Sequence, residues 1–243
     1  MLTLIKIAIT GSLASGKSTV CQLFEQWGAY VVNADRLLHR AFSADTPLGR
    51  RIYRLFGDRV FDGSLINRAK IAEIVAAEPK LLTKLEEICH PYVNREIQRH
   101  YRNACRKGRY LLFVAEVPLL FESRFPLWQW FDAVVVVTSD RTIAKQRYVY
   151  TGGTREQFDF REARQMPSLE KIQRAQYTLV NNGTLEELET NAKMLFESLQ
   201  RPLQTPQKTK NLRGFCKTRD RDMRSAGEGQ SFDLDETHSG NYG

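Results

Sequence analysis

A short segment near the start of the chain constrains the fold more than any other. Residues 11–18 read Gly-Ser-Leu-Ala-Ser-Gly-Lys-Ser, and this spacing is typical of loops that bind phosphate groups. The apolar run Leu4–Ile9 predicts a buried strand before the loop, and the apolar stripe from Val20 to Trp27 predicts a helix after it. Chance would produce the motif in roughly one chain in a hundred of this length. The context therefore predicts a phosphate-binding loop between a strand and a helix.

Each part of this loop has a role in holding a nucleoside triphosphate. Glycines allow the backbone to wrap a phosphate, and the start of a helix adds a partial positive charge. Lys17 can reach the β- and γ-phosphates, and the Ser18 hydroxyl suits Mg²⁺. The backbone N–H groups are expected to form an anion-binding nest, and they belong to Ala14, Ser15, Gly16, Lys17, Ser18 and Thr19.

The rest of the first 200 residues alternates between apolar runs and amphipathic stretches. Further strands are predicted at Tyr30–Val32, Tyr110–Val117, Ala133–Val137 and Tyr177–Val180. Pro79 and Pro91 each predict the start of a helix. A last helix is predicted from Thr184 to Leu199, behind a capping box of Thr184 and Glu187. Strands separated by helices indicate an α/β fold with a mainly parallel sheet of five strands.

Residues 201–243 differ from the rest in composition. They contain few large apolar residues and are rich in charged residues, Gly and Ser. Such a segment cannot bury enough surface to offset its ordering entropy, so a disordered tail is predicted. A basic arm that grips RNA is the alternative, but the basic and acidic residues are mixed rather than blocked. We expect one domain over residues 1–200, followed by this tail.

Composition excludes several other classes of protein. The chain has 243 residues, with 36 Lys and Arg against 28 Asp and Glu, and a formal net charge of +8. No apolar run approaches the ~20 residues that span a membrane, and the first residues do not resemble a signal peptide. The four cysteines lack the spacing of a zinc site. A cytoplasmic protein is therefore expected, and its positive charge suits an anionic partner.

A phosphate-binding loop alone leaves several functions open, because GTPases, motor ATPases and small-molecule kinases all have one. The Asn-Lys-x-Asp element with which GTPases usually read guanine does not occur in the sequence. Motor ATPases usually have longer domains than the ~200 residues expected to fold here. These observations favour a compact kinase.

Two carboxylates stand where predicted strands end. Asp35 follows the second strand and Glu116 lies at the end of the third, and in a parallel sheet this end faces the ligand crevice. Asp35 is placed to accept the proton of an acceptor alcohol, or alternatively to cap the following helix. Glu116 is placed to hold a water molecule on Mg²⁺, or alternatively only to solvate the strand end.

An arginine-rich stretch surrounds the flexible pair Gly152-Gly153. Such a stretch could be a lid, whose closure would bring guanidinium groups onto the phosphates and exclude water. Because acidic residues are interleaved, a solvated helical face is the alternative. His90 is by itself a weak signal, and a cap at a helix start explains it more simply than catalysis. The arginines are Arg147, Arg155, Arg161 and Arg164.

With these residues in place, the chain resembles the dephospho-coenzyme A kinase family over residues 4 to about 199. The loop is shared by many families, whereas the His-Pro, Pro-Leu-Leu-Phe-Glu and Asn-Asn-Gly elements are far more particular. The matching elements, in order, are Thr10-Gly11…Gly16-Lys17-Ser18-Thr19, Asn33-Ala34-Asp35, Phe56-Gly57, Asp62-Gly63, Leu65…Arg68, Leu85-Glu86, His90-Pro91, Val117-Pro118-Leu119-Leu120-Phe121-Glu122, Arg147, Gln165-Met166-Pro167…Lys171 and Asn181-Asn182-Gly183.

The resemblance implies a P-loop kinase with a five-stranded parallel core, a helical acceptor domain at about 36–108 and a lid at about 148–166. It implies transfer of the γ-phosphate of ATP to the ribose 3′-hydroxyl of dephospho-CoA, with Mg²⁺, as the last step of coenzyme A synthesis. ATP and dephospho-CoA would then be the partners, with no nucleic acid and no membrane. We expect a monomer or a weak oligomer.

The resemblance also implies roles for individual residues. Residues 14–19 would contact the ATP phosphates, with Lys17 as a catalytic cation. Asp35 would face the acceptor hydroxyl, and Arg147 would meet the nucleotide as a second catalytic cation. The acceptor side is expected to include His90 and Leu119, the adenine side Asn182, and the metal side Ser18 and Glu116.

Three positions depart from the pattern of the family. Asn33 replaces the first aspartate of Asp-Ala-Asp, which removes a charge near the site. Glu116 replaces a shorter aspartate, which is expected to shift a metal-bound water slightly. Gln176 replaces the aspartate before the last strand, and the sequence gives no consequence for this change.

Two other functions compete with this kinase. One is a non-catalytic or regulatory P-loop protein that binds RNA through its basic surface and tail, although interleaved aromatic and basic RNA motifs are absent from the sequence. The other is a small-molecule kinase with a different acceptor, such as a nucleoside monophosphate. Only the resemblance argues against this second alternative.

Overall fold

Strand β1 (Ile5–Gly11) lies inside a parallel sheet. The computed structural model of the chain describes residues 4–63, 65–123, 125–200 and 210–211. The strand order is β2-β5-β1-β6-β7-β8, and every neighbouring pair is parallel. The five predicted strands are confirmed, whereas β8 was not predicted because two residues carry no periodic pattern. The rest of the predicted tail lies outside the described residues. The other strands are β2 (Tyr30–Asn33), β5 (Leu112–Glu116), β6 (Ala133–Thr138), β7 (Tyr177–Val180) and β8 (Lys210–Asn211).

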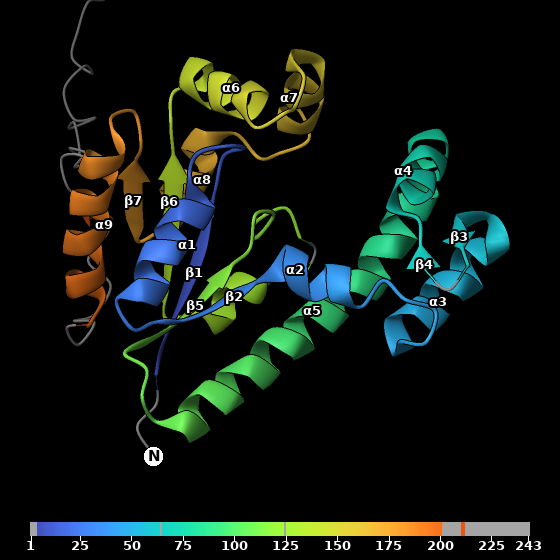
Figure 1. The fold of residues 1–243 in the computed structure, drawn as a ribbon, viewed down its shortest axis with the longest axis horizontal. Coiled ribbons are helices and arrows are strands. Elements are labelled where there is room, and N and C mark those ends of the chain that lie inside the picture. Colours follow the sequence, from blue (N-terminus) through green and yellow to red (C-terminus); the bar gives the residue numbers. More distant parts are fainter. Residues whose placement is uncertain (1–3, 64, 124, 201–209, 212–243) are drawn as a thin grey trace, which may run out of the picture.

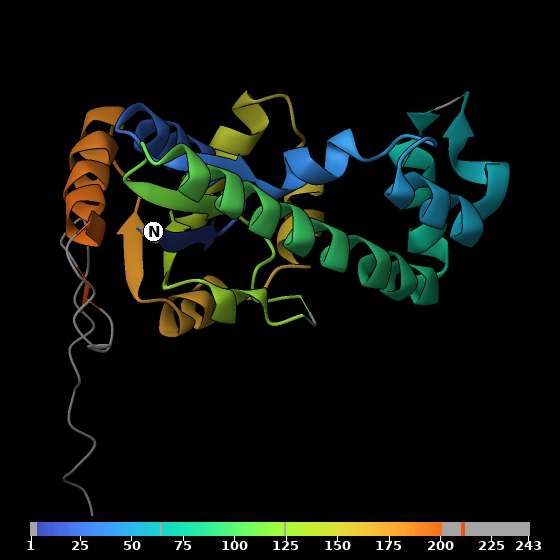
Figure 2. The same ribbon diagram turned by 90° about the horizontal axis from the view of Figure 1, so that it is seen from below.

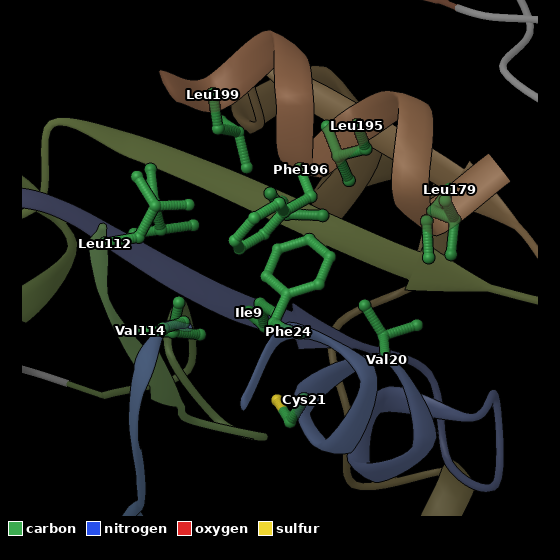
Figure 3. Close-up of a cluster of buried hydrophobic side chains, with 14 of the residues drawn as sticks. Ile9, Val20, Cys21, Phe24, Leu112, Val114, Leu179, Leu195, Phe196 and Leu199 are labelled. Carbon is green, nitrogen blue, oxygen red and sulfur yellow. The ribbon is translucent and has the colours of Figure 1, made fainter. Parts of the chain in front are cut away.

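The two faces of the sheet form two separate cores. Because side chains alternate along a strand, Ile7 and Ile9 of β1 pack under helices α1 (Lys17–Gln26) and α9 (Leu185–Gln200), while Ala8 faces the opposite core. In the first core Phe24 meets Phe196 edge to face, with ring centroids 5.1 Å apart (Figure 3). The predicted capping box of α9 is confirmed, since Thr184 Oγ1 accepts from the Glu187 N–H and Glu187 Oε2 accepts from the Thr184 N–H.

Helix α5 (Pro79–Lys107) connects the sheet to a third core (Figure 2). Its first half packs Cys89 among small helices, and its second half packs Ile97 and Ala104 on the second face of the sheet. Although α5 has 29 residues, neither it nor any other helix in the described ranges is apolar enough to cross a membrane. The other elements of this region are α2 (Ala34–Arg40), α3 (Pro47–Phe56), η1 (Gly57–Val60), β3 (Phe61–Asp62), β4 (Leu65–Ile66) and α4 (Arg68–Ala77).

The prediction that a helix begins at Pro91 was wrong. Pro91 lies inside α5, which begins at Pro79 as predicted. A proline inside a helix removes one backbone hydrogen bond. Here the residues on both sides of Pro91 are held by burial, Cys89 in the third core and Ile97 in the second. His90 is therefore a mid-helix residue rather than a cap.

Two helices stand over the edge of the sheet at which β1 and β6 end (Figure 1). They are α6 (Arg141–Tyr150) and α7 (Arg155–Glu162). Helix α8 (Ser168–Arg174) follows and packs on β6, and η2 (Leu127–Trp130) precedes that strand. The predicted lid, 148–166, thus begins inside α6. We use "lid" below for residues 141–166, which include both helices.

The first core gives a direct test of the fold. Replacement Phe196→Ala should lower the free energy of unfolding by about 3–5 kcal/mol, because it removes a fully buried ring and leaves a cavity. Urea denaturation followed by circular dichroism measures this change. Leu185→Ala on the same helix is the control, since its side chain is 65% exposed, and equal shifts in the two variants would contradict the packing.

Candidate active site

The loop between β1 and α1 has a backbone that requires its glycines. Gly11 and Gly16 have φ values of +146° and +94°, in the region that favours glycine. A Cβ atom at Gly11 would collide with the Val137 carbonyl oxygen, and one at Gly16 would collide with the Asn181 side chain. The loop is therefore held tightly between β6 and the chain that follows β7. Its end meets the first turn of α1, where the helix dipole favours an anion.

A cavity of about 680 Å³ lies against this loop. Its volume is within the range usual for ligand pockets. One wall comes from the loop and the other from the end of α6, so a ligand bound there would lie between the loop and the lid. We call it the nucleotide cavity; its lining residues are Ala14, Ser15, Gly16, Lys17, Ser18, Thr19, Gln146, Arg147, Tyr148, Tyr150 and Thr151.

The ammonium group of Lys17 is buried and bonded to backbone carbonyls rather than to a carboxylate. Its Nζ donates to the Ser12 carbonyl oxygen at 2.6 Å and to that of Gly11 at 3.4 Å. Burial lowers the pKa of Lys17 to about 8, with Lys171 adding to the effect and Glu116 opposing it. The lysine is therefore poised for a stronger anionic partner such as a phosphate.

Glu116 is buried and joins three elements. Its Oε1 accepts a hydrogen bond from Ser18 Oγ at 2.8 Å, and its Oε2 accepts one from Asn33 Nδ2 at 2.6 Å. Asn33 and Glu116 are also register partners on β2 and β5. These contacts rule out the alternative that Glu116 only solvates the end of the strand. A hydroxyl and a carboxylate together are the hard oxygen ligands that Mg²⁺ prefers, so the pair fits this ion.

Asp35 is the second residue of α2, but it does not cap that helix. The cap is Asn33, whose Oδ1 accepts from the Arg36 N–H at 2.8 Å. Burial, and then the negative charge of Glu116, raise the pKa of Asp35, while Arg68 and Lys17 oppose the rise. A carboxylate with a raised pKa is a better proton acceptor. The capping alternative for Asp35 is thus excluded, and its side chain lines a second cavity.

This second cavity, of about 440 Å³, opens between the sheet and the small helices. We call it the acceptor cavity. Its walls are mostly apolar and come from α2, α4, α5, the loop after β5 and the lid. Its charged and polar lining includes Asp35, Arg68, Glu86, His90 and Arg164.

The predicted acceptor residues His90 and Leu119 both line this cavity. His90 Nδ1 lies 3.1 Å from Ser123 Oγ, and the ring meets Phe125 edge to face. Burial lowers the pKa of His90, which favours its neutral form. The histidine is therefore placed to donate or accept a hydrogen bond without bringing a charge.

Arg147 lies at the opposite end of the site, on the nucleotide cavity. It donates to the carbonyl oxygens of Asn181 and Gly183 and to Asn181 Oδ1. Asn181 Nδ2 in turn donates to the Ser15 carbonyl oxygen at 2.9 Å. Asn182, expected near adenine, is not among the residues that line this cavity, and its Oδ1 accepts from the Asp140 N–H. The residue that connects α6 to the loop is thus Asn181.

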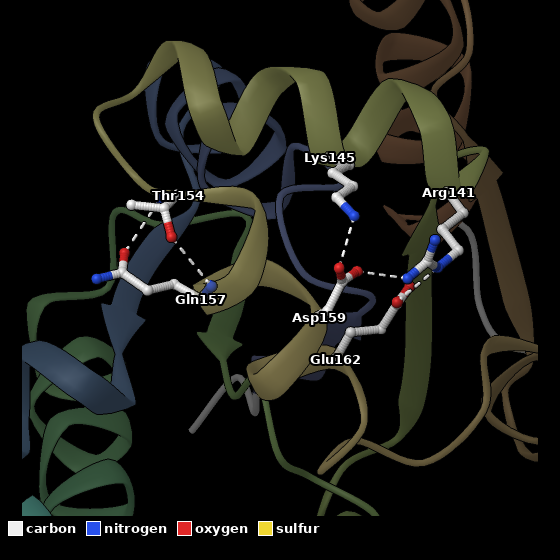
Figure 4. Close-up of polar contacts among 6 residues, drawn as sticks. All are labelled: Arg141, Lys145, Thr154, Gln157, Asp159 and Glu162. Atoms are coloured by element: carbon white, nitrogen blue, oxygen red, sulfur yellow. Dashed lines mark hydrogen bonds and ion pairs between the residues drawn. The ribbon is translucent and has the colours of Figure 1, made fainter.

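The lid is held together by ion pairs between its two helices (Figure 4). Asp159 of α7 accepts from Arg141 and Lys145 of α6, and Glu162 accepts from Arg141 at 2.7 Å. Of the predicted lid arginines, Arg147 reaches the nucleotide cavity and Arg164 the acceptor cavity. Arg161 instead packs over the Tyr148 ring. These ion pairs join the two helices, and residues of the segment line both cavities.

Three residues at the site have no signal of their own in the local pattern of the sequence. Arg68 lines the acceptor cavity and interacts electrostatically with Asp35. Lys171 and Glu122 form a 2.7 Å ion pair, and the lysine is fully buried. They occurred in the sequence analysis solely as members of the resembling elements. Their places depend on how distant segments pack, which no local spacing reveals.

The fold and the two cavities define a P-loop kinase of the small-molecule class. A model of the dephospho-CoA kinase family matches residues 5–187. The chain is 41% identical over 201 residues to a dephospho-CoA kinase of Chlamydia trachomatis, covering 82% of this chain and 98% of the relative. It is 40% identical over 202 residues to that of Protochlamydia amoebophila, with the same coverage. The chain therefore belongs to the dephospho-CoA kinase family, as the sequence predicts.

Solved structures agree with the fold. A Thermus thermophilus protein, TT1252, is 33% identical, with a TM-score of 0.69 over 82% of this chain and 99% of its own. A dephospho-CoA kinase from Campylobacter jejuni, at 20% identity, has a TM-score of 0.60 over 81% of this chain and 97% of its own, and so supports the fold. The family is one of ATP-dependent kinases, and its activity is the final step of CoA biosynthesis.

The lowered pKa of Lys17 gives a prediction about proton uptake. At pH 8 about half of the free protein should have a neutral Lys17, and a bound triphosphate should raise the pKa by charge attraction. Binding of ATP should therefore take up on the order of half a proton at pH 8 and much less at pH 6.5. Calorimetry in buffers of different ionisation enthalpy measures this uptake. Lys17→Met should abolish it, and unchanged uptake in that variant would contradict the assignment.

Proposed function

We propose that this chain transfers the γ-phosphate of ATP to the ribose 3′-hydroxyl of dephospho-CoA, with ATP in the nucleotide cavity and dephospho-CoA in the acceptor cavity. The observation that carries the proposal is the place of Asp35. Its carboxylate lines the acceptor cavity and interacts electrostatically with Lys17 and Glu116 of the phosphate-binding side. A hydroxyl held there would lie between a proton acceptor and the bound phosphates.

Asp35 acts as the proton acceptor in this proposal. The 3′-oxygen forms a bond to the γ-phosphorus, the bond from that phosphorus to the β,γ-bridging oxygen breaks, and ADP leaves. The hydroxyl proton passes to Asp35 and then to water. Because the pKa of Asp35 is raised, the carboxylate is a stronger base than an exposed aspartate.

Residues of the phosphate-binding loop and the lid stabilise the transferred group. Amide groups of residues 14–19 cradle the phosphates, and Lys17 moves from the Ser12 carbonyl to the γ-phosphate. Arg147 holds the nucleotide from the other wall of the cavity. Closure of the lid excludes water, which prevents hydrolysis of ATP in place of transfer.

Ser18 and Glu116 are the residues that would hold Mg²⁺, directly or through a water molecule. When bound there, such an ion would neutralise negative charge on the phosphate groups. The Ser18 hydroxyl donates to Glu116 Oε1, so the two oxygens lie side by side. Asn33 fixes the second carboxylate oxygen, and this leaves Oε1 for the metal side.

The walls of the acceptor cavity suit the chemistry of dephospho-CoA. Its long, largely uncharged arm fits the apolar lining, which includes Leu119. Arg68 and Arg164 are cations in the same lining, and they suit its pyrophosphate. His90, whose neutral form is favoured by its lowered pKa, is hydrogen-bonded to Ser123 Oγ and is available to a polar group of the acceptor. A cytoplasmic location and a monomeric or weakly oligomeric state stay predictions.

Asp35→Asn tests the proposed base. It should lower kcat by about 10²–10⁴-fold with little change in ATP affinity, because the amide keeps the shape but cannot accept the proton. An ADP-release assay with Mg-ATP and dephospho-CoA, beside AMP, CMP and adenosine, measures both rate and acceptor choice. Asp45→Asn, an exposed aspartate after α2, is the matched control. Loss of ATP binding would make Asp35 structural, and preference for another acceptor would replace dephospho-CoA as the substrate.

Truncation after Gln200 separates the kinase from an RNA-binding protein. The residues placed in the site lie before position 200, so kcat and both KM values should change less than about twofold. A filter-binding assay with single-stranded RNA at several salt concentrations runs beside it. Tail-dependent, steeply salt-sensitive RNA binding together with absent kinase activity would favour the regulatory alternative.

A further inference from the structure

Lys171 is a fully buried cation that lines neither cavity. Its Nζ lies 2.7 Å from Glu122 Oε1 and 3.5 Å from the carbonyl oxygens of both Gly11 and Pro118. A buried charge is costly unless it is paired and hydrogen-bonded. The charge of Lys171 lies where three segments meet, and this suggests a role for Lys171 beyond packing.

Glu122 connects the same cation to the end of the lid. Its Oε1 accepts from the Met166 N–H at 2.9 Å as well as from Lys171. Its Oε2 is buried, yet has no hydrogen-bond partner among the described residues. Buried polar atoms without partners are rare and call for an explanation. One oxygen of the carboxylate is thus left to accept a further hydrogen bond.

The three segments that meet at this pair serve different parts of the site. Gly11 starts the phosphate-binding loop. Pro118 belongs to the loop after β5 that lines the acceptor cavity, and its carbonyl also accepts from Thr10 Oγ1 at 3.0 Å. Met166 ends the lid, which contributes Arg147 to the nucleotide cavity and Arg164 to the acceptor cavity. A displacement of any one segment must therefore act on the same ion pair.

We propose that Lys171 and Glu122 are positioning residues that couple the two substrate cavities through the lid. The pair fixes the carbonyl groups of Gly11 and Pro118 relative to each other, and it fixes the end of the lid relative to both. A ligand that closes the lid over one cavity then prepares the other for binding. This inference rests on the proposed function, since it needs ATP and dephospho-CoA in the two cavities.

The experiment measures coupling rather than activity alone. The dissociation constant of dephospho-CoA is determined by calorimetry with and without saturating Mg-β,γ-methylene-ATP, and the ratio of the two constants is the coupling factor. The wild-type factor should be at least about fivefold, the lower end of typical coupling between sites. In Lys171→Met it should fall to nearly one, while each ligand alone binds within about threefold of wild type. Turnover should fall about tenfold or more.

Two further variants separate positioning from stability. Lys171→Met leaves the largely buried Glu122 carboxylate without its cation, so the Tm of this variant is expected to fall. The double variant Lys171→Met with Glu122→Gln removes both charges and should recover much of the Tm but not the coupling. Lys6→Met is the matched control, because it breaks the 3.0 Å Lys6–Asp132 ion pair and Lys6 lines neither cavity. It should leave the coupling factor unchanged.

Each outcome decides the proposal. Recovery of the coupling together with Tm in the double variant would make the pair merely structural and overturn the inference. Independent binding of the two ligands to the wild-type protein would overturn it as well, while leaving the proposed function intact. Failure of the wild-type protein to bind or phosphorylate dephospho-CoA would instead overturn the proposed function, and the inference with it.

Discussion

Parallel pairing of β1 with both β5 and β6 is the constraint on which the site depends. Ile9 is the register partner of Glu116 on one side, and Gly11 is that of Val137 on the other. Because all three strands run the same way, the phosphate-binding loop and the Glu116 carboxylate emerge at the same edge of the sheet. A slip of one residue would turn Glu116 to the opposite face, and its bond to Ser18 would be lost.

At this edge of the sheet the Lys17 cation contacts neutral carbonyl groups, and the Glu116 carboxylate accepts hydrogen bonds from neutral donors. Lys17 donates to carbonyl oxygens and Glu116 accepts from two neutral donors, Ser18 and Asn33. An ammonium on a carbonyl gains less than one on a phosphate oxygen. Entry of a triphosphate can therefore recruit Lys17 without first breaking an ion pair. Lys171, by contrast, is neutralised by Glu122, which suits a fixed cation that does not leave its place.

Much of the fold could be predicted because it follows from local pattern. The β-branched run Ala133–Val137 predicts a buried strand, and the spacing from Gly11 to Gly16 and Lys17 predicts the loop that precedes α1. Pro91 was misleading, because tertiary packing keeps α5 helical through a residue that locally favours a helix start. Asn181 and Lys171 are brought to the loop by packing across more than 150 residues of chain. Their distance along the sequence hides them from any local reading.

Asn33 and Glu116 show why departures from a family pattern are best considered together. Taken singly, Asn33 removes a charge near the site, and Glu116 is expected to shift a metal-bound water. In the structure the two side chains are hydrogen-bonded, because Asn33 Nδ2 donates to Glu116 Oε2. Asn33 Oδ1 caps α2 at the same time. An aspartate at position 33 could still cap the helix, but it could not donate, and its charge would repel Glu116. The amide thus supports the longer carboxylate and adds no third negative charge beside Asp35, whose pKa the charge of Glu116 already raises.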